Sequence, residues 1–129
     1  MLTIKGFKIE SYEDACAAIG IKPLTIEDFS SLPEDERQYH YSQHRLLTVH
    51  SAFHAGRTFD WEDVNQRKFL PVWDMETYGD GRKNDGCVLH FVNCNYGCTS
   101  VGSRLCSFST EEAEYIAEQF IEDYRNIIR

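Results

Sequence analysis

The sequence predicts a single α+β domain, and three observations support this fold class. A chain of 129 residues, 42% of them hydrophobic, is long and apolar enough to bury one core. Apolar residues recur at three- and four-residue steps, as on one face of a helix. Two further segments, rich in aromatic and β-branched residues, are separated by turn formers. We expect residues 1–129 to form one globular domain with N-terminal helices, a small antiparallel sheet of about three strands, and a C-terminal amphipathic helix packed on the sheet.

The first helix is expected at about residues 12–19. Ser11 precedes it and Asp14 stands three positions later, which resembles a capping box. Gly20 suits the position just after a helix, where glycine accepts a left-handed backbone. Residues 25–29 can then form one more short turn.

A longer helix is expected to begin near Pro33 and to end at Gly56. Proline is favoured in the first turn of a helix, and acidic residues follow it here, where they complement the helix dipole. On a helical wheel, one sector should face the core, and it holds Tyr39, Leu46, Val49 and Phe53.

Two strands are expected at residues 69–77 and 87–93, joined as a hairpin by a long loop. Glycine, asparagine and aspartate between them supply the turn chemistry. Pro71 cannot donate a ladder hydrogen bond, so it indicates an edge strand, a bulge or a strand start. A third short strand is expected over residues 104–108.

The last helix should start after Ser109, because Glu112 completes a second capping box. Its apolar residues follow at helical spacing and should cover the sheet; they are Ala113, Ile116, Ala117, Phe120, Ile121, Tyr124 and Ile128.

Charge and cysteine content restrict the setting in which the chain works. Acidic residues outnumber basic ones by 21 to 13, so the net charge of −8 disfavours binding to nucleic acid or to anionic membranes. No apolar run reaches the roughly 18 residues of a membrane span, and the first residues lack a signal-peptide pattern. Five cysteines, an odd number, favour reduced thiols and a cytoplasmic location.

One candidate site is a zinc site near the end of the second strand. Its best ligand set is His90, Cys94, Cys98 and Cys106, because thiolates and imidazoles are the ligands that zinc prefers. The spacing is not the repeated two-residue knuckle of common zinc folds, however, and free cysteine is often simply buried. Small core or turn cysteines, with no cofactor, are therefore the favoured interpretation.

A second candidate site lies on the long helix, where four histidines share one arc of the surface. His40 and His54 are 14 residues apart, about 21 Å along a helix, so the four cannot bind one metal. Either the arc is a polar flank of the helix, or it contacts a partner protein and gains charge between about pH 7 and 6. The partner-binding residues are then His40, His44, Leu47 and His54.

Other chemistry has weaker support. The sequence has no phosphate-binding loop and no nucleophile elbow, and a thiol nucleophile at Cys98 or Cys106 would need His90 as its base. The aromatic residues Phe59, Trp61, Phe69 and Trp73 can line a ligand pocket, but in a small domain they more often form the core.

Several segments carry a resemblance to a known family. They are residues 11–16, 32–34, 65–73 (NQRKFLPVW) and 101–106 (VGSRLC), followed by the capped last helix. In the order and spacing of these segments the chain resembles a family of small uncharacterised proteins encoded by gut Bacteroides and by their phages and prophages. The resemblance implies a bacterial or phage setting and an accessory role, and it implies no catalytic residue.

Three functions follow, in order of preference. The first is a non-enzymatic accessory protein that binds a protein partner through the histidine-flanked helix or the edge strand. The second is a small domain that binds zinc or a ligand at His90, Cys94, Cys98 and Cys106. The third is a small hydrolase or thiol enzyme.

Overall fold

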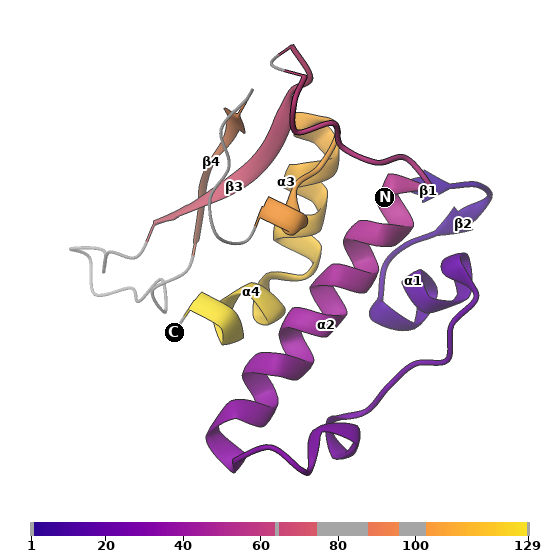
Figure 1. Cartoon of the computed structure of the whole chain (residues 1–129), viewed down its shortest axis with the longest axis vertical. Coiled ribbons are helices and arrows are strands. Elements are labelled where there is room, and N and C mark those ends of the chain that lie inside the picture. The colour runs from indigo at the N-terminus through magenta and orange to yellow at the C-terminus, as the bar shows by residue number, and fades with distance from the viewer. Residues whose placement is uncertain (1, 64, 75–87, 96–102, 129) are drawn as a thin grey trace.

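The computed structural model of the chain describes residues 2–63, 65–74, 88–95 and 103–128 (Figure 1). Over these residues it has four α-helices and two antiparallel sheets of two strands each, so the α+β fold class is confirmed. In chain order the elements are β1 (Thr3–Ile4), β2 (Phe7–Lys8), α1 (Tyr12–Ile19), a 3₁₀ helix (Ile26–Phe29), α2 (Glu34–His54), β3 (Lys68–Asp74), β4 (Val88–Asn95), a second 3₁₀ helix (Ser103–Leu105), α3 (Thr110–Gln119) and α4 (Ile121–Ile128).

Local capping explains why α1 and the turn after it form where the sequence predicts them. The Ser11 hydroxyl accepts a hydrogen bond from the Asp14 N–H at 3.1 Å, and Gly20 ends α1 in the left-handed region at φ 75°. Thr25 and Asp28 form a capping box at the short 3₁₀ helix. The small β1–β2 hairpin was not expected from the sequence.

The long helix α2 lies between α1 on one side and α3 and α4 on the other (Figure 1). Its residues Leu46, Val49 and Phe53 are fully buried, as predicted, but Tyr39 is 41% exposed and that assignment is wrong. The first turns of α2 extend past the end of α4, so Tyr39 has no core to enter. The other large buried residues come from the segments on either side: Ile9, Tyr12, Ile116, Phe120 and Tyr124.

The predicted hairpin is confirmed as β3 paired with β4, with a register irregularity between Val72 and Trp73. Pro71 lies opposite Val92, and in a two-stranded sheet β3 is an edge strand, as proline requires. The loop expected between the strands, residues 78–86, lies outside the described residues.

The expected third strand over residues 104–108 is wrong. Ser103–Leu105 is a 3₁₀ helix, and only Ser107 pairs with β3, through two backbone hydrogen bonds to Phe69 of 3.1 and 2.9 Å. The 3₁₀ helix ends at Leu105, directly before this pair, and the carbonyl of Cys106 is bound by two histidines of α2.

The last helix is two helices rather than one. Ser109 caps α3 by accepting a hydrogen bond from Glu112, as predicted, but the helix breaks at Phe120, where ψ reaches 33°. Before the break α3 packs on β3 and β4, and after it α4 packs on α2. The bend buries Phe120 and turns Tyr124 towards α2, which one straight helix lying on the sheet would not achieve.

The end of α2 generates a stability prediction. Ala55 follows the helix with φ 54°, a left-handed conformation that costs free energy in any residue with a Cβ atom. Ala55→Gly should raise the free energy of unfolding in urea by about 0.5–1 kcal/mol. The matched control Ser51→Gly, at an exposed position inside α2, should lower it by a similar amount. A loss of stability in both variants would contradict the strained cap.

Candidate functional site

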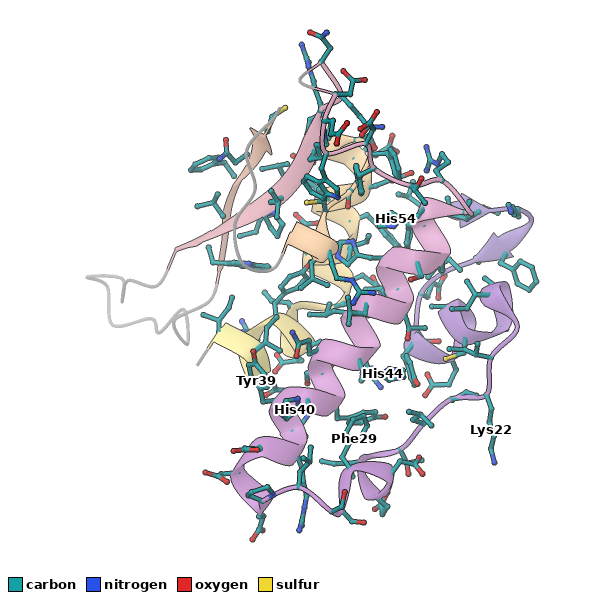
Figure 2. The ribbon with its side chains drawn as sticks, viewed as in Figure 1. Lys22, Phe29, Tyr39, His40, His44 and His54 are labelled. Atoms are coloured by element: carbon teal, nitrogen blue, oxygen red, sulfur yellow. The ribbon has the colours of Figure 1, made fainter. Side chains whose placement is uncertain are left out.

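His44 is used inside the fold rather than on a free surface. Its Nε2 lies 2.8 Å from the hydroxyl of Tyr12, which also accepts a hydrogen bond from the Leu24 N–H at 2.9 Å. The Tyr12 hydroxyl therefore links His44 of α2 to the segment before the first 3₁₀ helix. The His44 ring also lies beside that of Phe29, with centroids 6.1 Å apart (Figure 2). Burial lowers the pKa of His44, so the ring is neutral at neutral pH.

His50 and His54 bind the same carbonyl oxygen. His50 Nδ1 and His54 Nε2 lie 3.2 and 2.7 Å from the oxygen of Cys106, and both must donate because a carbonyl only accepts. The remaining nitrogen of His50 accepts from the Tyr124 hydroxyl at 2.9 Å. Burial lowers the pKa of His50 to about 3 and also lowers that of His54. The two neutral rings join α2 to the segment before α3 and to α4.

These contacts separate the four residues predicted to bind a partner. His44 and His54 lie far apart along α2, and His40 packs edge-on against Tyr39 (Figure 2). Leu47 and His54 line one pocket, which His40 and His44 do not reach. Burial lowers the pKa values of His44 and His54, so both rings gain charge at a lower pH than an exposed histidine does. Partner binding by this arc stays a prediction.

The pocket that contains Leu47 and His54 has a volume of about 230 Å³. It lies between the C-terminal half of α2 and the segment that follows it, and the remaining lining residues are Ser51, Arg57, Thr58, Phe59, Trp61 and Arg104. Phe59 and Trp61 were candidates for a ligand pocket from the sequence, whereas neither arginine was. Arg57 and Arg104 are isolated and distant in the chain, so no sequence pattern joins them.

A stack of side chains forms one wall of this pocket. The Arg57 guanidinium lies 4.2 Å from the centre of the Phe108 ring, and Phe108 stacks on Phe59 with centroids 4.1 Å apart and planes 7° from parallel. Trp61 follows at 5.6 Å from Phe59. The His54 ring lies perpendicular to both phenylalanine rings, with centroids 5.2 and 5.3 Å away. Of the aromatic residues that were candidates for a pocket, Phe59 and Trp61 line this one, whereas Trp73 packs on the core.

The buried Lys68 fixes the loop that carries Trp61. Its ammonium group donates to the carbonyls of Asp60 at 2.9 Å and Asp63 at 3.1 Å, and it lies 5.3 Å from the centre of the Trp61 ring. A buried lysine needs such acceptors, because an ammonium without partners is costly away from water. The loop that forms the pocket's aromatic wall is therefore attached to the start of β3.

The predicted zinc ligands are only partly described. Cys98 lies outside the described residues, and so does the side chain of His90, although its backbone belongs to β4. Cys94 pairs with Phe69 on one side of β3, while Ser107, next to Cys106, pairs with Phe69 on the other side. Among the described residues no three histidine, cysteine or acidic side chains gather around a common point. The zinc site stays a prediction.

A nucleophilic role for Cys106 has no support from its surroundings. Burial raises the pKa of the Cys106 thiol to about 11, so the reactive thiolate is scarce at neutral pH. A catalytic cysteine needs the opposite shift, which a nearby cation or a helix N-terminus usually provides.

The outer edge of β4 is the second feature that offers binding groups. Phe69 exchanges both of its backbone hydrogen bonds with Ser107, so its N–H and C=O point away from β4. Cys94 pairs with Phe69 in the antiparallel ladder, so the N–H and C=O of Cys94 point away from β3. The same holds for Val92, which lies two residues earlier on β4. No described residue pairs with them there, and only the Cys94 N–H is covered, by the side chain of Asn93 at 2.9 Å.

Comparisons of the chain with protein-family models, with curated proteins and with solved structures found no match. Over the described residues, none of the helices has the length and apolar character that crossing a membrane requires. The function is therefore inferred from the chemistry of this chain's own residues.

The buried histidines generate a prediction about pH. An unfolded His50 has a pKa near 6.5, whereas the folded one has a pKa of about 3, so the unfolded chain binds more protons between these values. Stability should therefore be lost as the pH falls below about 6.5, by up to about 1.4 kcal/mol per pH unit for this residue. Urea unfolding measured from pH 7 to pH 5 checks the slope.

His50→Gln is the matched variant for this experiment. The glutamine amide can still donate to Cys106 and accept from Tyr124, but it does not titrate. Its unfolding free energy should depend less steeply on pH than that of the unmodified chain. Equal slopes would show that His50 is not a buried neutral ring.

Proposed function

We propose that this chain is a non-enzymatic interaction protein, and that the outer edge of β4 adds an extended segment of a partner protein to the sheet. The observation that carries this proposal is the pair of outward-facing backbone positions at Val92 and Cys94. A strand edge with unpaired N–H and C=O groups is a template for a further strand, and the backbone hydrogen bonds supply much of the affinity.

The composition of β4 supports this role. Native edge strands usually discourage pairing with charged residues or proline, and Val88–Asn95 contains neither a lysine, an acid nor a proline. In contrast, β3 has Pro71, and its outer edge is partly covered by Ser107. Over the residues that the structure describes, the sheet therefore offers one edge for addition, that of β4.

Side chains next to this edge can provide specificity. Phe91 pairs with Val72, and the register irregularity at the next position places Phe91 on the face opposite Trp73 and Leu89, which pack on the core. Phe91 is 48% exposed. Leu70 and Val72 of β3 alternate onto that same outer face and are partly exposed. An apolar side chain of an added strand can pack across Phe91 while its backbone pairs with β4.

The wider setting of the proposal rests on the sequence. The resemblance to proteins of Bacteroides and their phages supports an accessory role in a bacterial or phage setting, and the odd number of cysteines supports a cytoplasmic location. The net charge of −8 supports a protein partner over nucleic acid.

Proline at Val92 tests the proposal directly. Val92→Pro removes the outward N–H but no hydrogen bond between β4 and β3, so the fold should persist by circular dichroism. Peptides selected on the unmodified chain from a random displayed library should bind Val92→Pro at least about tenfold more weakly. In the unmodified chain, the bound peptides should also slow hydrogen exchange of the Val92 amide.

Val92→Ala is the control, because it shortens the same side chain and keeps the N–H. It should bind the selected peptides within about threefold of the unmodified chain. Peptides that bind Val92→Pro equally well would contradict the proposal. Self-association that Val92→Pro abolishes would also contradict it, because the edge would then serve a second copy of this chain.

A further inference from the structure

We propose that the pocket between α2 and the segment after it binds a small anion carried on a single planar ring, such as an aromatic carboxylate or an aryl phosphate. This site is separate from the β4 edge and goes beyond the proposed function. Two arginines and two aromatic side chains line one space of about 230 Å³, near the labelled His54 in Figure 2. Positive charge beside ring surfaces is the combination that such a ligand needs.

Arg57 is held in place before any ligand arrives. Its Nε donates to the His54 carbonyl at 2.9 Å and its Nη2 to the Phe53 carbonyl at 3.0 Å, so it caps the end of α2. The face of its guanidinium lies on Phe108. These contacts leave Nη1 without a described hydrogen bond, and a preorganised donor loses little conformational entropy on binding.

Arg104 supplies the second charge. It is exposed, lines the same pocket, and makes no hydrogen bond or ion pair with any residue that the structure describes. The Glu112 carboxylate forms an ion pair with Arg57, with 3.5 Å between Oε1 and Nη2. Among the described residues that line the pocket, two carry a guanidinium group and none carries a carboxylate, so the lining is positive even though the whole chain is acidic. His54 adds no charge at neutral pH, since burial lowers its pKa.

The pocket's size and aromatic wall limit what the anion is attached to. Phe59 is held by its stacking on Phe108, and Trp61 is 37% exposed, so an aromatic surface is available to a ligand. Sites for drug-sized molecules have volumes of about 300–1,000 Å³. A space of about 230 Å³ suits one ring and its anionic group better than a nucleotide.

Calorimetric titration with phenyl phosphate and with benzoate, at low ionic strength, tests the site. At least one of these probes should bind saturably below about 10 mM. Inorganic phosphate, which lacks the ring, and benzyl alcohol, which lacks the charge, should each bind at least about tenfold more weakly. Trp61→Leu should remove most of the advantage of the aryl anion over inorganic phosphate.

Arg104→Gln is the central variant, because a side chain without described partners can be changed without unfolding the chain. It should weaken binding of the aryl anion at least about tenfold. Lys22→Gln removes one positive charge at a surface distant from His54 (Figure 2) and should change the affinity less than about twofold. The proposal fails if neither aryl anion binds, if inorganic phosphate binds as tightly, or if the two variants behave alike.

Discussion

The carbonyl oxygen of Cys106, which accepts hydrogen bonds from both His50 and His54, determines how the two halves of this chain fit together. It lies between α2, which belongs to the N-terminal half, and the start of α3. A buried carbonyl left without donors costs about 1–3 kcal/mol, and each histidine would also lose a partner. The two bonds therefore hold residues 103–108 against α2, where the sequence alone indicates a strand.

Both candidate binding features depend on that short segment. Ser107 pairs with Phe69 and so covers part of the outer edge of β3, whereas no described residue pairs with the outer edge of β4. Phe108, one residue later, lies between Arg57 and Phe59 and supports the aromatic wall of the pocket. Because a two-stranded sheet is marginal alone, the hairpin needs this attachment and the cover of α3.

Local rules explain which parts of the fold were predictable from the sequence. The caps at Ser11, Gly20 and Ser109 are determined by neighbouring residues, and so is the apolar stripe through Leu46 and Phe53. The break at Phe120 and the missing third strand depend instead on contacts with α2, far away in the chain. The arc of four histidines was visible in the sequence, but the burial of His50 was not, since the same spacing also suits an exposed flank. Only the aromatic side of the pocket could be predicted, because no sequence pattern links Arg57 to Arg104.

The protonation states of His50 and His54 test this account most directly. A long-range ¹H–¹⁵N spectrum of the ring nitrogens at pH 7 distinguishes the two neutral tautomers from the cation. The account predicts two neutral rings, with the proton on Nδ1 in His50 and on Nε2 in His54, because each must donate to the Cys106 carbonyl. A cationic ring, or the opposite tautomer at either residue, would contradict the shared carbonyl and with it the placement of residues 103–108.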